Sequence, residues 1–514
     1  MRGTHILVVL GTSIVMTPHA PARAQEATSA RALLERAAEA MGGLTRLQGL
    51  DNFVMTGFGQ RYSLNGNISA DANSPPKWQA VADAQRSFDL RRGRALNQER
   101  NSYMFPFALS FGHSWNRTST AQTGRAMLDH PLPALLRALA PGTALGPVTV
   151  QDGLAVVPFT LDDGTPMWMG LDQQTRLPYW TRWITGSDTL GDVTNTAYFT
   201  GYVPFNGVML PLGLMTRIDW RNQITSMFQA DSYRINSSDM PEFPEQRARG
   251  LGGRRAPPQV AVNKIADGVW DVDVVSGNPI AALGDSGGAV VEFTDHLVMF
   301  EAYGSGEQTL ARIDAANRLV PGKAVASLII SHHHDDHAAG LRAAVSRGIA
   351  IIGQARNQKL YEEWVSRPAV YFPDELSRHP QPLRFIPVDE HLTLQDSLRR
   401  LDVYHVVANF HMSDAVIAYL PAERIIMEGD FTDQNYEFNW WGYSLRGNIE
   451  HYGLDPLIDI PVHGSVGPIQ EKLARTREQV EAAQAFCARS AERGIYPFGC
   501  PVQYTTTGPV ELKR

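Results

Sequence analysis

The stretch that decides the fold is Leu328-Ile329-Ile330-Ser331-His332-His333-His334-Asp335-Asp336-His337, where an apolar run passes directly into a cluster of histidines and aspartates. A short run of large apolar residues indicates a buried strand. In sheets that carry helices on their faces, the loop at the carboxyl end of such a strand holds the functional groups. A helical pattern follows at residues 338–347, so the cluster is built into the fold. These features predict an α/β domain with a functional loop at residues 331–337.

The residue types in this loop are those that bind divalent metal ions. Alternate side chains of an extended backbone share a face, so His332 and His334 can converge on one ion while His333 points away. Asp336 and His337 follow at the turn into the helix, where they can reach a second ion. Imidazole and carboxylate groups bind Zn²⁺ at roughly 2.0–2.2 Å. The alternative is a solvated histidine-rich tract that binds metal adventitiously, but the position between a strand and a helix favours a functional site.

Strands and helices alternate around the loop, which predicts a layered α/β domain. The expected strands are residues 269–275, 289–293, 297–300, 324–330, 349–352, 416–420 and 425–427. A long helix is expected at residues 471–493, near the end of the chain.

The N-terminal half has a different pattern. A helix is expected at residues 29–41, where apolar residues recur at helical spacing before Gly42-Gly43. From residue 52 to about residue 235, alternating apolar and polar residues are interrupted by Asp-Gly and Asn-Gly turns. This pattern predicts a mostly antiparallel β domain.

The chain is too long for a single core. Its 514 residues have the composition of a globular protein, with 43% hydrophobic and 19% charged residues. Residues 236–261 are rich in Pro, Gly, Ser and Arg and have no periodicity, which predicts a linker. We therefore expect a β-rich domain at residues 25–235 and a catalytic domain at residues 262–514.

The first 24 residues have the features of a secretory signal peptide. Arg2 precedes an apolar run at residues 6–16, and Ala22-Arg23-Ala24 provides an A-x-A cleavage site. No other stretch approaches the roughly 20 apolar residues of a membrane helix. We expect a periplasmic or secreted protein without stable membrane insertion. Removal of residues 1–24 changes the formal net charge from −7 to −9, which disfavours nucleic acid as a partner.

Two cysteines, Cys487 and Cys500, lie close together near the end of the chain. In the oxidising compartment that a signal peptide implies, they can form a disulfide that ties the last helix to the tail. Two buried free thiols are the alternative.

Three further residues of types that bind metals follow the histidine-rich loop along the chain. His411 lies 74 residues after the histidine-rich loop, and Asp430 follows the strand expected at residues 425–427. His463 lies in a Pro-x-His-Gly element. Together with the H-x-H-x-D-H pattern of the loop, this order resembles the metallo-β-lactamase superfamily over roughly residues 262–490. The resemblance implies the αβ/βα sandwich of that superfamily.

The resemblance also implies a set of seven metal ligands in two groups that share one carboxylate. The implied ligands are His332, His334 and His411 for one ion, Asp336, His337 and His463 for the other, and Asp430 between them.

The implied chemistry is hydrolysis by a hydroxide that bridges two divalent ions, with Asp336 as the catalytic residue that orients it. Zn²⁺ is the expected metal, and Mn²⁺ or Fe²⁺ are alternatives. The expected substrate is a small molecule with an ester, lactone or β-lactam-like amide bond. An alkylsulfatase-type or phosphodiesterase-type hydrolase is the alternative within the superfamily.

An aromatic stretch lies between the implied ligands Asp430 and His463. Its position predicts a wall of the substrate site, and core packing is the alternative. The candidate substrate-binding residues are Tyr436, Trp440, Trp441 and Tyr443. The candidate partners that orient ligand imidazoles are His405, Asp414 and His451.

Residues 172–183 and 205–211 resemble the strands and turns of the half-open barrels of periplasmic lipoprotein carriers. This resemblance implies a concave sheet that holds a greasy ligand or braces the second domain. A lipid-like ligand-binding protein with a vestigial metal domain is therefore the alternative from another class. The sequence carries no indication of oligomeric state.

Overall fold

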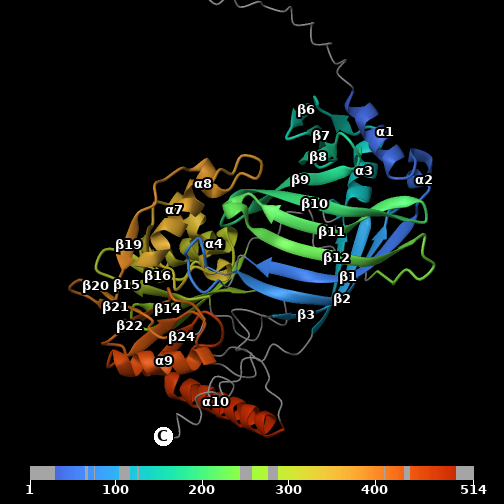
Figure 1. The fold of residues 1–514 in the computed structure, drawn as a ribbon. Helices are drawn as coiled ribbons and strands as arrows, with labels where there is room; N and C mark the ends of the chain where they lie inside the picture. Colours follow the sequence, from blue (N-terminus) through green and yellow to red (C-terminus); the bar gives the residue numbers. More distant parts are fainter. Residues whose placement is uncertain are drawn as a thin grey trace, which may run out of the picture.

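The computed structural model describes residues 29–63, 67–74, 76–103, 116–123, 127–243, 258–275, 287–409, 411–432 and 440–493. The predicted signal peptide, residues 1–24, lies outside these ranges. No helix among the described residues is both long enough and apolar enough to cross a lipid bilayer. Figure 1 shows a broad curved sheet, coloured blue to green, beside a layered part coloured yellow to red.

The N-terminal part is a single sheet of twelve strands in the order β4-β3-β2-β1-β12-β11-β10-β9-β8-β7-β5, with β6 also paired to β7. Its strands are β1 (Asn52–Ser63), β2 (Lys77–Asp89), β3 (Arg94–Tyr103), β4 (Asn116–Thr123), β5 (Ala144–Leu145), β6 (Thr149–Gln151), β7 (Leu154–Thr160), β8 (Pro166–Asp172), β9 (Pro178–Ser187), β10 (Gly191–Phe205), β11 (Val208–Ile218) and β12 (Ile224–Ile235). The predicted antiparallel β structure is confirmed. Strand β1 also pairs with β12, with Phe53 opposite Ile235, so the first and last strands of the sheet are neighbours.

Three helices pack on one face of this sheet: α1 (Ala30–Ala40), α2 (Leu44–Gln48) and α3 (Pro131–Leu139). Helix α1 confirms the predicted helix, and the Ser29 hydroxyl caps it by accepting the N–H of Ala32. Helix α3 was not predicted. It begins with Pro131 at its first turn, a position where proline is well tolerated, and it buries Leu132 and Leu135 against the sheet.

The C-terminal part contains two further sheets and seven α-helices among its described residues. The first sheet contains β13 (Gln259–Ala266), β14 (Val269–Val275), β15 (Ala289–Glu292), β16 (Leu297–Phe300), β17 (Val325–Ile329), β18 (Ala350–Gln354) and β19 (Phe385–Val388). The second contains β20 (His391–Gln395), β21 (Arg400–His405), β22 (Val416–Leu420), β23 (Ile425–Glu428), β24 (Ile458–Pro461) and β25 (Gly467–Pro468). The helices are α4 (Gly306–Ala316), α5 (Asp335–Ala338), α6 (Leu341–Ser346), α7 (Gln358–Ser366), α8 (Glu375–Arg378), α9 (Trp440–His451) and α10 (Ile469–Glu492).

Alternation along the strands explains how these elements form layers. In β16, Leu297 and Met299 pack with α4, α6 and α7 on the outside, whereas Val298 and Phe300 face the space between the two sheets. Alternate residues of β22 also face opposite sides: one set faces the space between the two sheets, and the other packs in a cluster with α9 and α10. The result is helices, sheet, sheet and helices, which is the predicted αβ/βα sandwich.

The helix predicted at residues 338–347 corresponds to α6, and the short helix α5 precedes it within the stretch that was predicted to be a loop. Gly340 lies between the two helices, and a Cβ atom added there would lie 1.9 Å from Thr309 Oγ1 in α4. Its N–H donates to the carbonyl of Ala302 rather than continuing the first helix. Close packing against α4 therefore interrupts a sequence pattern that is locally helical.

Polar and apolar contacts join the twelve-stranded sheet to the sandwich. Leu190 and Trp220 of the N-terminal part share a core cluster with residues of α4, α6 and α7. The Asp192 carboxylate accepts the backbone N–H groups of residues 370–372 at 2.7–3.0 Å. The Arg367 guanidinium donates to the carbonyl of Leu190 at 2.8 Å. The sandwich is therefore packed directly on one end of the sheet.

Cys487 lies in α10, where it is buried and disulfide-bonded. Cys500, the other half of the predicted bridge, lies outside the described residues. Part of the expected linker, residues 244–257, also lies outside them, and β13 begins at Gln259.

Candidate metal centre

The seven predicted ligands come together at one edge of the sandwich. The loop after β17 and the helix α5 contribute four of them, and loops after β21, β23 and β24 contribute the rest. Because β23 and β24 are parallel neighbours, the loops that follow them emerge at the same edge. The first region contributes His332, His334, Asp336 and His337, and the other loops contribute His411, Asp430 and His463.

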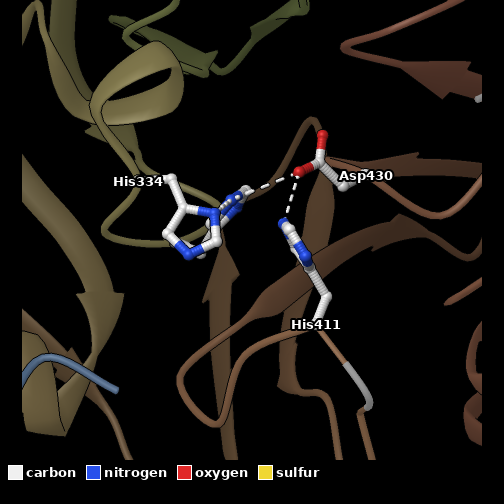
Figure 2. Close-up of side chains that lie close together, drawn as sticks. His334, His411 and Asp430 are labelled. Carbon is white, nitrogen blue, oxygen red and sulfur yellow. Dashed lines mark hydrogen bonds and ion pairs between the residues drawn. The ribbon is translucent and has the colours of Figure 1, made fainter. Parts of the chain in front are cut away.

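The first cluster, which we call group one, consists of His332, His334 and His411. His332 Nε2 lies 3.0 Å from His334 Nδ1. The His411 ring stands edge-on to His334, with ring centroids 4.5 Å apart. Ligand atoms of these residues and of Asp430 all lie within 4.8 Å of one another, and all four residues are buried. Figure 2 shows His334, His411 and Asp430 around this space.

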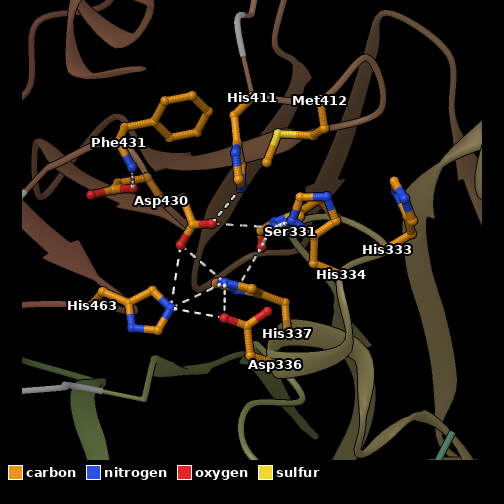
Figure 3. A network of polar contacts seen from close by, with 12 residues as sticks. Ser331, His333, His334, Asp336, His337, His411, Met412, Asp430, Phe431 and His463 are labelled. Atoms are coloured by element: carbon orange, nitrogen blue, oxygen red, sulfur yellow. Dashed lines mark hydrogen bonds and ion pairs between the residues drawn. The ribbon is translucent and has the colours of Figure 1, made fainter. Parts of the chain in front are cut away.

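The second cluster, group two, consists of Asp336, His337 and His463. His463 Nε2 lies 3.2 Å from His337 Nε2. Asp336 Oδ2 lies 3.7 Å from His337 Nε2 and 3.5 Å from His463 Nε2. These three ligand atoms also lie within 4.8 Å of one another. Figure 3 shows group two beside group one.

Asp430 lies between the groups, and its two oxygens face different clusters. Oδ2 lies 2.8 Å from His411 Nε2 and 3.5 Å from His332 Nε2. Oδ1 lies 3.0 Å from His337 Nε2 and 3.3 Å from His463 Nε2. The carboxylate is therefore placed to contribute one oxygen to each group.

Burial and neighbouring charges set the protonation of these side chains. Burial lowers the pKa of His332 and His334 well below the usual imidazole value, and neighbouring imidazoles lower it further. Burial raises the pKa of Asp430, but His337, His411 and His463 together outweigh burial and hold the Asp430 pKa well below its usual range. Group one thus presents neutral imidazoles next to an ionised carboxylate, the protonation states that metal binding requires.

Group two favours a positive charge between its carboxylates. Burial lowers the pKa of His337, but Asp430, Asp336 and Glu301 together outweigh burial and hold the pKa well above the usual imidazole value. The negative potential at this position is therefore strong enough to overcome complete desolvation of a cation.

Glu301 is a buried partner of group two that the sequence analysis missed. Its Oε2 lies 3.1 Å from His337 Nδ1, while Oε1 accepts the backbone N–H groups of Ala302 and Ser331. Its backbone has φ 85°, and Arg312 donates to its carbonyl at 3.0 Å. A carboxylate bound to one imidazole nitrogen orients the other nitrogen toward a metal. The available signal was an acidic residue directly after the predicted strand at residues 297–300.

Ser331 and Gly429 lie beside the Nδ1 atom of the His332 ring. Ser331 Oγ lies 2.9 Å from His332 Nδ1, which directs Nε2 into group one. A Cβ atom added to Gly429 would lie 2.7 Å from Ser331 Oγ and 3.2 Å from His332 Nδ1. The residue before Asp430 must therefore be small for this loop to approach the histidine.

His333 points away from both groups, as predicted, and its Nδ1 lies 2.7 Å from Asp414 Oδ2 (Figure 3). Asp414 was expected to orient a ligand imidazole, but it binds this histidine instead. His405 Nε2 lies 3.0 Å from the carbonyl oxygen of Ser413. His451 packs against Tyr452 at the end of α9.

The N-terminal part of the chain also contacts the metal centre. The sequence did not predict this contact. His334 Nε2 lies 3.0 Å from the carbonyl oxygen of Asn67, in the connection between β1 and β2. At the start of β2, burial lowers the pKa of Lys77, while Asp336 and Asp430 oppose that shift. The Lys77 ammonium therefore lies close enough to both carboxylates to interact with them.

The aromatic candidates for a substrate wall are only partly described. Tyr436 lies outside the described residues, as do the side chains of Trp440 and Trp441 at the start of α9. Tyr443 is described, and its side chain is half exposed on α9. Their role in substrate binding stays a prediction.

A family model and several solved structures are similar to part of this chain. The family model described as "Metallo-beta-lactamase superfamily" matches residues 289–448. A metallo-beta-lactamase from Pontibacter korlensis is 17% identical, with 43% of this chain and 99% of that chain covered and a TM-score of 0.34. The metallo-beta-lactamase FIM-1 from Pseudomonas aeruginosa is 17% identical, with 44% and 96% covered and a TM-score of 0.33. Residues 289–448, which carry the H-x-H-x-D-H motif and Asp430, belong to the metallo-β-lactamase superfamily.

Proposed function

We propose that this chain is a secreted, dinuclear metal-dependent hydrolase that cleaves an ester, lactone or β-lactam-like amide bond of a small molecule. The observation that carries the proposal is the position of Asp430. One of its oxygens lies 2.8 Å from His411 and the other 3.0 Å from His337, so a single carboxylate serves two separate clusters of ligand atoms.

The residues at the centre fit two divalent cations. Group one presents neutral imidazoles at one oxygen of Asp430, and group two favours positive charge at the other. Zn²⁺ accepts this mixture of imidazole and carboxylate, and Mn²⁺ or Fe²⁺ accept it as well. When bound, a pair of such ions activates a water molecule and polarises the bond to be cleaved.

Exposure indicates where a substrate reaches the site. The side chains of Asp336 and His463 are 41% and 21% exposed, whereas those of His332 and His411 are 1% and 5% exposed. The accessible side is therefore group two. There the Asp336 carboxylate can accept a hydrogen bond from the attacking water and orient it toward the substrate.

Metal analysis combined with a substrate panel tests this proposal. The purified protein is loaded with Zn²⁺ or Mn²⁺ and assayed on a chromogenic ester, a lactone, a β-lactam, an alkyl sulfate and a phosphodiester. We expect two bound ions and turnover of an acyl substrate, and we expect Asp336→Ala to abolish that turnover. Turnover of only the sulfate or phosphodiester would contradict the substrate class. Absence of bound metal, or full activity of Asp336→Ala, would overturn the mechanism.

Export is supported by the sequence of the first 24 residues. Expression of the full chain in a bacterium, followed by fractionation and mass analysis, tests it. A periplasmic or secreted product that begins at Gln25 is expected. Retention of an uncleaved product in the cytoplasm would contradict export.

A further inference from the structure

The connection between β1 and β2 contacts the metal centre although it belongs to the twelve-stranded sheet. We call its described part, residues 67–74, the β1–β2 loop. Besides the Asn67 contact with His334, the carbonyl of Ile68 accepts the N–H of Ser413, two residues after His411, at 2.7 Å. Figure 1 shows this loop in blue against the yellow part of the sandwich near α4. The loop therefore contacts the side chain of the group-one ligand His334 and the backbone of Ser413, which lies close in sequence to the ligand His411.

The loop has a defined shape and a buried anchor. The Ser69 N–H donates to Ser74 Oγ at 3.1 Å, and the Ser74 N–H donates to the carbonyl of Asp71 at 3.0 Å. Ala70 is 5% exposed and packs in the core cluster that also contains α4, α6 and α7. Its carbonyl accepts from Arg221 at 3.3 Å. The loop is thus held against the sandwich independently of the contact with His334.

The contact with Asn67 decides which nitrogen of His334 is available to a metal. A carbonyl oxygen can only accept a hydrogen bond, so His334 Nε2 must carry the hydrogen. A neutral imidazole then has its lone pair on Nδ1. Nδ1 is the atom that faces His332 Nε2 at 3.0 Å inside group one. The Asn67 carbonyl therefore selects the tautomer whose lone pair points into the site.

From this geometry we propose that the β1–β2 loop of the N-terminal sheet is a positioning element of the metal centre, which sets the metal-facing nitrogen of His334 through the Asn67 carbonyl. This inference rests on the proposed function, because it assigns a role within the same site. It also gives the N-terminal sheet a role: metal binding by group one depends on a residue outside the sandwich.

Two variants of the full chain test the proposal through metal binding rather than through activity. Ala70→Glu places a charge at the buried anchor and should displace the loop. Ala72→Glu makes the same change at an exposed position of the same loop. Zn²⁺ is titrated against a chromophoric chelator, and circular dichroism confirms folding. We expect the group-one ion to bind roughly 10–100-fold more weakly in Ala70→Glu, as for other lost ligand partners. Ala72→Glu should bind both ions like the unchanged protein. A folded Ala70→Glu variant that also does so would overturn the proposal.

Nuclear magnetic resonance of the unchanged protein decides the question even if Ala70→Glu does not fold. Protein labelled with ¹⁵N-histidine is measured without metal and with ¹¹³Cd²⁺, and the His334 signals are assigned by their loss in His334→Gln. We expect a slowly exchanging Nε2–H in both states and cadmium coupling to Nδ1. Hydrogen on Nδ1 without metal, or coupling to Nε2, would overturn the inference. Failure of the protein to bind any metal would defeat the proposed function, whereas the metal-free spectrum would still report the tautomer.

Discussion

The two groups of the metal centre are supported in different ways. Group one is buried, and its His334 is held by Asn67 from the twelve-stranded sheet. Group two is partly exposed, and its His337 is held by Glu301 from the sandwich itself. Burial and support from the N-terminal sheet therefore coincide in group one, while group two is open on the side where a substrate can arrive.

The N-terminal sheet also comes close to group two, through Lys77, which interacts with Asp336, and through a contact with Asp335, which is not a candidate ligand. Thr189, in the connection between β9 and β10, donates to Asp335 Oδ1 at 2.9 Å. The neighbouring ligand Asp336 instead has its backbone carbonyl bound by the N–H of Gly304, within the sandwich. The difference between the groups therefore concerns the hydrogen-bond partner of the ligand imidazole, which comes from the sheet for His334 and from the sandwich for His337, and not the mere proximity of the sheet.

Loss of the shared carboxylate should have the largest effect. Asp430→Ala removes an oxygen from both groups and leaves five imidazoles and one carboxylate to share two cations. We expect affinity for both ions to fall by more than the roughly 10–100-fold that follows loss of an outer partner. Isothermal titration with Zn²⁺ measures both affinities. Selective loss of one ion would show that Asp430 serves one group only.

Removal of the metal ions should distinguish the two groups, because the groups differ in exposure. If the free metal exceeds the Kd about 1,000-fold, each bound ion stabilises the folded protein by about 4 kcal/mol. Because group two is more exposed, its ion should leave first as a chelator is added, and thermal unfolding should shift in two steps. A single step that releases both ions together would contradict the difference between the groups.

Glu301→Gln should weaken group two alone. The amide retains the size of the side chain but removes the charge that holds His337, so affinity for the group-two ion should fall roughly 10–100-fold. Glu307→Gln, the same change at an exposed position in α4, is the matched control. Equal weakening of both ions by Glu301→Gln would mean that the groups are not supported separately.

Thr189→Ala should have the smallest effect on the metals. It removes one hydrogen bond between the sheet and Asp335, which should lower the free energy of unfolding by about 1 kcal/mol. Both metal affinities should stay within about twofold, since neither group loses a ligand partner. Chemical denaturation and metal titration of the variant measure the two quantities. A clear loss of the group-two ion would show that this contact also positions a ligand.

Local patterns in the sequence predicted much of the sandwich. The strand expected at residues 416–420 agrees with β22. Both faces of this strand pack against apolar layers, so its residues form a continuous apolar run that is visible in the sequence. Gly340 could not be recognised as a break, because the residue that crowds it, Thr309, lies on another helix. The same reason explains the missed partners of the ligands. Glu301 is 36 residues from His337, and Asn67 is 267 residues from His334, so only the folded chain brings them together.

Anomalous diffraction at the zinc absorption edge, from crystals of the Zn²⁺-loaded full chain, shows directly whether the two groups hold two ions. We expect two peaks on opposite sides of the Asp430 carboxylate, one beside His334 Nδ1 and one beside His337 Nε2. A single peak, or peaks elsewhere in the molecule, would contradict a dinuclear centre shared by the two groups.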